Sequence, residues 1–211
     1  MHSSSFRKIS DFIHRNKYES VRYRKNMSTL RFLKEYIKHP RTVGALLPSS
    51  PRLVKQMIAP INFEQATCIV EYGPGTGVFT EEIIQHKCED TVFLIVEYNK
   101  EFYHELQRKY EGIKNVHVVC DSAEHTYKYL QQYKIKKVDY IVSGLPFTSL
   151  PKDVSTKILQ VTKDLLGDHG HLILFQYSRF KQNFLKSFFM DIRTERVIRN
   201  VPPAFVFTCS K

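Results

Sequence analysis

The sequence has 211 residues, 42% of them hydrophobic, a length that suits one well-buried core and is short for two. No apolar run approaches the ~20 residues that cross a bilayer, the first residues do not resemble a signal peptide, and four scattered cysteines indicate neither disulfides nor a metal site. The formal net charge of +11 points instead to an anionic partner, either nucleic acid or an acidic membrane surface.

The positive charge is concentrated at the N-terminal end. Residues 1–41 hold 11 basic residues against three acids, a net charge of +8, so the other 170 residues carry only +3. Apolar residues recur at helical spacing between the basic ones, which predicts amphipathic helices that end before Pro40. We expect residues 1–40 to contact an anionic membrane or to cover the site as a lid, with ordinary packing against the main domain as the alternative. The main domain is then residues 41–211.

A short helix is expected from Pro51, with Ser50 as its N-cap. From residue 68 onward, apolar runs typical of strands alternate with polar, helical stretches, which predicts a mostly parallel sheet covered by helices on both faces, a Rossmann-like α/β fold. A helix near residues 180–190 and an antiparallel hairpin over residues 195–209 complete it. The expected strands are 68–73, 91–98, 116–121, 138–144 and 171–177, and the expected helices are 78–87, 100–110, 123–133 and 151–166.

The first strand runs into the turn EYGPGTGVFT, residues 71–80, at the sheet edge where such folds bind ligands. A phosphate-binding P-loop needs a lysine followed by Ser or Thr, but Val78 and Phe79 follow the last glycine. A dinucleotide fingerprint spaces its glycines as G-x-G-x-x-G, whereas the spacing here is G-x-G-x-G. Glu71, two residues before the first glycine, suits a ligand that carries an ammonium group rather than a pyrophosphate.

Acids also end the next two predicted strands. Glu97 lies where a carboxylate accepts hydrogen bonds from both hydroxyls of a ribose. Asp121 and Ser122 lie where an adenine amino group would be bound. S-adenosylmethionine carries an ammonium, a ribose and an adenine, so acids at three successive strand ends favour it as the ligand.

The motifs VEYGPGTGVFT, VEYN, CDSA and SGLPF resemble those of class I S-adenosylmethionine-dependent methyltransferases. From about residue 30 to the end, with VGALLPSSPRLVKQM and NVPPAFVF, the sequence resembles bacterial phospholipid N-methyltransferases, which are related to the rRNA adenine dimethyltransferases. The expected cofactor contacts are Ser49, Ser50, Glu71, Gly73, Pro74, Gly75, Gly77, Thr80, Glu97, Tyr98, Asp121, Ser122 and Ser143.

The stretch SGLPF, residues 143–147, is expected to lie over the transferred methyl group. In enzymes that methylate the amine of adenine, the resembling motif begins with Asn, Asp or Ser and ends in an aromatic residue that stacks on the flipped base. Gly144 occupies that first position here, so the side-chain acceptor is missing. RNA dimethyltransferases also append a helical RNA-binding domain, whereas this chain stops at Lys211. We therefore expect a lipid amine, not RNA.

The resemblance implies phosphatidylethanolamine as the substrate. We expect a cytoplasmic monomer at the inner face of the membrane, which adds one to three methyl groups to this lipid. Tyr177 is the candidate catalytic residue. Ornithine-containing lipids, an rRNA adenine substrate and a non-catalytic binding protein remain as alternatives. The expected substrate contacts are Tyr36, Arg41, Gly144, Leu145, Pro146 and Phe147.

Overall fold

The computed structural model describes residues 50–178, 182–198, 200 and 202–211. The predictions made for residues 1–40, and for Tyr36, Arg41 and Ser49, lie outside the described residues and stay predictions. None of the described helices combines the length and the apolar composition that crossing a bilayer requires.

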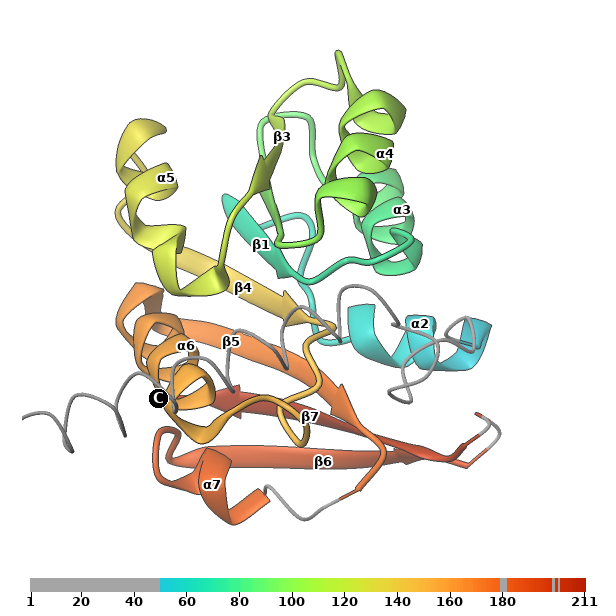
Figure 1. Ribbon diagram of the computed structural model, residues 1–211, viewed down its shortest axis with the longest axis vertical. Helices are drawn as coiled ribbons and strands as arrows, with labels where there is room; N and C mark the ends of the chain where they lie inside the picture. The colour runs from blue at the N-terminus through green and yellow to red at the C-terminus, as the bar shows by residue number, and fades with distance from the viewer. Residues whose placement is uncertain (1–49, 179–181, 199, 201) are drawn as a thin grey trace, which may run out of the picture. The chain divides into compact units, whose positions relative to one another are not determined.

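The described part of the chain contains one seven-stranded sheet with the strand order β3-β2-β1-β4-β5-β7-β6 (Figure 1). Strands β1 to β5 pair in parallel, whereas β7 is antiparallel to both β5 and β6. This confirms the Rossmann-like fold and the C-terminal hairpin, whose connection contains Pro202 and Pro203. The strands are β1 (Cys68–Tyr72), β2 (Val92–Glu97), β3 (Val116–Cys120), β4 (Val138–Ser143), β5 (Leu166–Gln176), β6 (Asp191–Val197) and β7 (Ala204–Ser210).

Helices connect the parallel strands, as such crossovers require. Ser50 caps the first described helix, because its hydroxyl accepts a hydrogen bond from the backbone N–H of Leu53 at 3.2 Å. The helix expected over 123–133 is divided into a short 3-10 helix and an α-helix. The helices are α2 (Pro51–Ile58), α3 (Val78–His86), α4 (Lys100–Tyr110), η1 (Ala123–His125), α5 (Thr126–Gln132), α6 (Lys152–Leu165) and α7 (Gln182–Lys186).

The start of β5 differs from the prediction, which placed it at His171. Leu166 already pairs with Val138 of β4, and the register then shifts between Val138 and Tyr140. The backbone at Gly170 passes so close to Val138 that a Cβ there would lie 2.8 Å from the Val138 carbonyl oxygen. The sequence did not indicate this bulge. Gly167 and Gly170, the two glycines that permit it, are equally typical of an ordinary turn between a helix and a strand.

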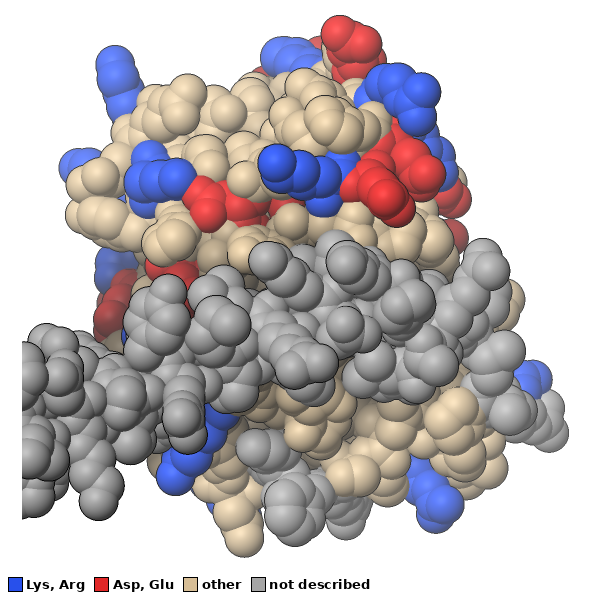
Figure 2. Space-filling view, viewed as in Figure 1, with Lys and Arg blue, Asp and Glu red and all other residues tan. Residues whose placement is uncertain are grey.

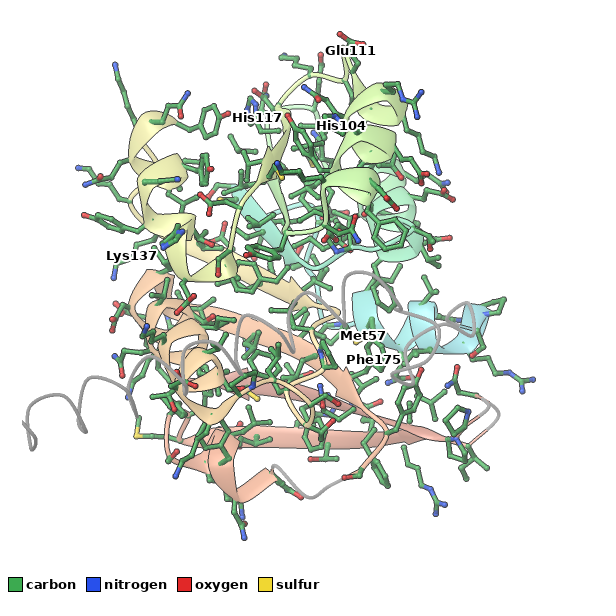
Figure 3. All side chains as sticks on the ribbon, viewed as in Figure 1. Met57, His104, Glu111, His117, Lys137 and Phe175 are labelled. Carbon is green, nitrogen blue, oxygen red and sulfur yellow. The ribbon has the colours of Figure 1, made fainter. Side chains whose placement is uncertain are left out.

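Both faces of the sheet are covered. All five residues of β1 are buried, and successive strand side chains point to opposite faces. One face packs against α2, α3 and α4 in a cluster that includes Met57 and Phe175, both labelled in Figure 3. Tyr72 points to the other face, toward Thr126 of α5 and Thr162 of α6. The sheet is therefore rigid enough to hold the ends of its strands in fixed positions.

Charged side chains of both signs are interspersed over α3 and α4 on the face that Figure 2 shows. Lys109 pairs with Glu81, and Lys114 pairs with Glu89 at 3.2 Å. Exposed pairs of this kind add little stability. The described side chains over α3 and α4 therefore form no continuous basic stripe of the sort that binds a nucleic-acid backbone.

Candidate functional site

The candidate site lies where the strand order reverses, between the carboxyl ends of β1 and β4. In open α/β sheets, ligands bind in the crevice at this point. Tyr72, the last residue of β1, pairs with Ser143, the last residue of β4. The glycine turn that follows β1 and the SGLPF stretch that follows β4 are therefore neighbours, as the sequence analysis predicts.

The glycine turn leaves room for a ligand. Gly73, Gly75 and Gly77 have φ values of +61°, +57° and +83°, a left-handed region that side chains disfavour. A Cβ built on Gly75 would meet no atom within 4 Å, so the space beside this residue is open. Gly77 then starts α3 as its N-cap, with Pro74 accepting from its backbone N–H. The turn presents bare backbone to an open space at a helix N-terminus.

Glu71 is fully buried at the end of β1. Its Oε2 accepts a hydrogen bond from the hydroxyl of Thr80 at 2.7 Å. Its Oε1 has no hydrogen-bond partner among the described residues, which is costly for a buried polar atom. Burial raises the pKa of Glu71 to about 8, and the nearby Glu97 adds to the rise, while the Thr80 bond opposes it. An ammonium group on the ligand would pair with Oε1. It would give this oxygen a hydrogen-bond donor and would lower the pKa of Glu71.

This pKa predicts a specific dependence of stability on pH. Because the folded pKa is raised above the ordinary value of 4.5, the folded state holds the proton more tightly, and stability falls as the pH rises from about 4.5 to about 8. Glu71→Gln should remove that loss and melt roughly 5 °C higher than the native protein near pH 9, with little difference near pH 4. Thermal melts without cofactor across this range check the prediction, and Glu64→Gln is the exposed control. Equal pH profiles for the native protein and Glu71→Gln would contradict it.

Glu97 lies at the end of β2 and is almost completely buried. Its Oε1 accepts from the backbone N–H of Asn99 at 2.7 Å, and its Oε2 accepts from the backbone N–H of Gly75 at 3.1 Å. Burial raises its pKa, although the backbone hydrogen bonds oppose the shift. The carboxylate also accepts from the backbone N–H of Tyr98. It thus ties the second strand end to the glycine turn and keeps lone-pair capacity for a further donor.

Asp121 follows β3, and its carboxylate is already surrounded by donors. Oδ1 accepts from the backbone N–H of Ser122 and from the His125 ring, and Oδ2 accepts from the Tyr129 hydroxyl and Lys128. Partial burial raises its pKa, but these hydrogen bonds outweigh burial and hold the pKa well below its usual range. The expected contact with an adenine amino group would therefore compete with four existing partners. The sequence pattern did not predict these side-chain donors, which come from η1 and α5.

Tyr98 and Ser122, the neighbours of the two acids, have different surroundings. Tyr98 is exposed, which leaves its ring available to a ligand. The hydroxyl of Ser122 accepts from the backbone N–H of Glu124 at 3.3 Å and so caps η1. Neither observation assigns a ligand contact, and both roles stay predictions.

The turn after β4 comes very close to the glycine turn. The backbone N–H of Gly144 donates to the carbonyl of Tyr72 at 2.9 Å. A Cβ on Gly144 would lie 2.5 Å from the carbonyl oxygen of Gly73, which is backbone and cannot rotate away. The buried Ser143 hydroxyl accepts from the backbone N–H of Leu145 at 3.2 Å. Position 144 therefore admits glycine alone in this conformation.

Phe147 and Tyr177 are the aromatic candidates for contact with the substrate. Phe147 is only 1% exposed, so a flipped base or a head group would have to displace its neighbours to stack on it. Pro146 and Leu145, by contrast, are partly exposed. Tyr177 is half-buried just after β5 and packs edge-on against Phe175, and burial raises the pKa of its hydroxyl. The predicted role of Tyr177 is compatible with this position.

Gln176, the last residue of β5, is a residue that the sequence analysis missed. It is only 4% exposed, its Nε2 donates to the carbonyl of Leu145 at 3.1 Å, and its Oε1 accepts from the backbone N–H of Thr148 at 3.3 Å. It therefore holds the turn after β4 from the neighbouring strand. The one available signal was an amide side chain inside an apolar strand, because such a group needs buried partners.

The residues present fit S-adenosylmethionine. The open space at Gly75, the unpartnered oxygen of Glu71 and the remaining lone pairs of Glu97 match a small ligand with an ammonium group and a ribose. The Ser50 hydroxyl accepts from Leu53 as the cap of α2 and keeps its O–H and one lone pair, so its contact with the cofactor stays a prediction. Carboxylate acceptors and bare backbone therefore surround the open space, and these groups suit the ammonium and the ribose of the ligand.

Comparison with known proteins gives consistent relationships. The family model of ribosomal RNA adenine dimethylase matches residues 47–179. An ornithine lipid N-methyltransferase from Singulisphaera acidiphila is 31% identical over 179 residues, which cover 84% of this chain and 93% of that relative. Both matches span the glycine turn and the SGLPF stretch.

Solved structures of low sequence identity share the fold. The 1,6-didemethyltoxoflavin-N1-methyltransferase of Burkholderia thailandensis, with bound S-adenosylhomocysteine, aligns with a TM-score of 0.64 at 12% identity over 89% of each chain. A 16S rRNA N2 G1207 methyltransferase from T. thermophilus, in complex with AdoMet and guanosine, aligns with a TM-score of 0.60 at 18% identity over 81% of this chain and 45% of that chain.

Proposed function

This chain belongs to the ribosomal RNA adenine dimethylase family of class I S-adenosylmethionine-dependent methyltransferases, and on that premise we propose that it methylates the primary amine of a membrane-lipid head group. It is an S-adenosylmethionine-dependent N-methyltransferase, which sets aside the non-catalytic alternative. The lipid substrate is supported by the relative named ornithine lipid N-methyltransferase. Phosphatidylethanolamine and ornithine lipid share the same reacting group, a primary amine.

The observation that carries the proposal is the approach of Gly144 to Gly73. A side-chain acceptor at position 144, as in the motif of adenine methyltransferases, would start from a Cβ only 2.5 Å from the Gly73 carbonyl oxygen. Real side chains do not tolerate that distance. The acceptors left at the turn are backbone carbonyls, which suit a small tetrahedral amine that needs no planar base recognition.

In the reaction, the chain's own residues would exclude water from the lipid amine and position it. S-adenosylmethionine supplies a methyl group on a sulfonium centre. An ammonium has no lone pair, so the lipid amine must first lose its proton to solvent, and a desolvated pocket favours this loss because it lowers the pKa of the amine. The carbonyl oxygens of Ser143 and Gly144 and the Tyr177 hydroxyl would accept hydrogen bonds from the neutral amine and aim its lone pair. The Leu145 carbonyl already accepts from Gln176 and from the backbone N–H of Phe147. Since burial raises the pKa of Tyr177, its hydroxyl orients the amine rather than acting as an ionised base.

The second candidate substrate is an adenine in rRNA, because the matching family model carries that description. Burial of Phe147 and the glycine at position 144 oppose it. The predicted contacts of Tyr36 and Arg41 with the head group, and of residues 1–40 with the inner face of the membrane, belong to the same lipid proposal and concern residues that the structure does not describe.

The test compares three methyl acceptors with the same labelled cofactor. Full-length protein is incubated with methyl-labelled S-adenosylmethionine and, in parallel, with phosphatidylethanolamine vesicles, ornithine lipid vesicles or rRNA. We expect label in a methylated lipid and none in rRNA. Label confined to rRNA would establish the alternative, and label in neither lipid would refute the proposal. Which lipid is labelled identifies the head group.

A further inference from the structure

The tip of the β6–β7 hairpin lies at the same edge of the sheet as the candidate site. β6 and β7 are paired from Asp191↔Ser210 to Val197↔Ala204. Phe205 at the start of β7 pairs with Gln176 at the carboxyl end of β5. The turn beyond Val197 therefore lies at the carboxyl edge of the parallel strands. In Figure 1 it extends on the side to which the arrowheads of β4, β5 and β6 point.

The described residues of this turn form a mostly apolar tip. Ile198 is 66% exposed, and Pro202 and Pro203 are exposed as well. We call Ile198, Asn200, Pro202 and Pro203 the hairpin tip. Single exposed apolar residues are common on protein surfaces, but here Ile198, Pro202 and Pro203 are all exposed in the one connection between β6 and β7.

Asn200 makes the hairpin tip rigid. Its side chain is buried; Nδ2 donates to the Pro202 carbonyl at 2.7 Å, and Oδ1 accepts from the backbone N–H of Ser50 at 3.2 Å. The second bond ties the tip to the start of α2. Two consecutive prolines restrict the backbone further. A rigid tip loses little conformational entropy when its apolar residues are buried in a partner.

Basic side chains flank the hairpin tip. Arg196 is exposed beside it and lies over the ring of Phe205, at 5.9 Å from the ring centroid. Arg52, exposed in the first turn of α2, follows the Ser50 that Asn200 binds. The one acid near the end of β6, Glu195, pairs with Arg193 at 2.7 Å. An apolar tip with flanking cations matches the interface of an anionic bilayer, where apolar groups enter below the phosphates.

We propose that the hairpin tip is a membrane-docking element that inserts Ile198 into the interfacial region of an anionic bilayer and so brings the carboxyl edge of the sheet to the lipid head groups. The inferred benefit of docking, access to lipid head groups, rests on the proposed function. The exposed apolar tip and its basic neighbours do not depend on it. It assigns a membrane contact to the C-terminal hairpin, separate from the one expected of residues 1–40.

The test measures binding of the full-length protein to vesicles of phosphatidylglycerol and phosphatidylcholine, without cofactor and without an amine lipid. Ile198→Asp should weaken vesicle binding about tenfold, because it removes buried apolar area and adds a charge repelled by the surface. Ile198→Trp should retain or tighten binding, since tryptophan favours the interface. Met190→Asp is the matched control: Met190 is 88% exposed and precedes β6 at the opposite edge of the sheet.

The outcomes separate this proposal from the proposed function. Selective loss in Ile198→Asp supports docking through the hairpin tip even if no lipid becomes methylated. Equal effects of Ile198→Asp and Met190→Asp, or no vesicle binding by the native protein, overturn it even if lipid methylation is found. Ile198-dependent pull-down of a protein in place of vesicle binding would likewise overturn it. Melting temperatures of the variants verify that each is folded.

Discussion

Glu97→Gln should weaken the binding of S-adenosylmethionine about a hundredfold, roughly 3 kcal/mol. The carboxylate already accepts from the backbone N–H groups of Asn99 and Gly75, and we propose that its remaining lone pairs bind the ribose hydroxyls. Glutamine replaces one carboxylate oxygen by an NH2 group, which only donates. This group would face the donor of a backbone N–H, and the ribose would lose an acceptor. Hydrogen bonds to charged groups are worth about 1.5–3 kcal/mol each. Titration calorimetry measures the change.

Two comparisons make the Glu97 prediction specific. Glu101→Gln removes the same charge from an exposed position on α4 and should bind the cofactor normally. Methylthioadenosine has the ribose and adenine but no ammonium, so Glu97→Gln should weaken its binding too, whereas Glu71→Gln should weaken only the binding of S-adenosylmethionine. An affinity for S-adenosylmethionine in Glu97→Gln within about threefold of the native value would contradict the assignment.

The positions of Glu71, Glu97 and Asp121 could be read from the sequence because strand ends are local features. An apolar run followed by an acid or glycine fixes the end of a parallel strand to within a residue, and all parallel strand ends share one edge of the sheet. The observed ends of β1, β2, β3 and β4 each differ from the predicted ends by at most about one residue.

The hydrogen bonds of those acids could not be read in the same way. Whether the carboxylate of Asp121 is free depends on η1, which brings His125 to it, and on α5, which brings Lys128 and Tyr129. The support of the SGLPF turn by Gln176 joins residues 31 apart in sequence. Such contacts depend on how helices and strands pack, and helical periodicity gives the face of a helix but not the atom that it presents.

Gly144→Ala should lower the rate of methyl transfer at least about a hundredfold. One methyl group would meet the Gly73 carbonyl oxygen at 2.5 Å, and because both groups are backbone, the two turns must separate. Overpacking of this kind costs about 1–3 kcal/mol, and a displacement of the acceptor by an ångström is enough to lose a hundredfold in rate. The measurement is turnover at saturating lipid, with the melting temperature recorded alongside.

Gly167→Ala is the matched control, since its Cβ would lie 3.7 Å from the nearest atom, an ordinary contact in the β5 bulge. It should keep native turnover. A Gly144→Ala variant that keeps turnover within about threefold of the native value would show that the turns separate freely, and it would remove the main objection to a side chain at position 144.

The same distance bears on the choice between lipid and RNA. Asparagine at position 144, the residue expected of an adenine methyltransferase, needs the same Cβ position before its amide can reach a base, so Gly144→Asn should lose lipid methylation and gain no activity on rRNA. Transfer of label to rRNA by Gly144→Asn would mean that the turn adapts to its side chain. If instead folded Gly144→Ala and Gly144→Asn are both inactive on lipid and on rRNA, the close approach of Gly144 to Gly73 is required for methyl transfer, as the lipid proposal expects.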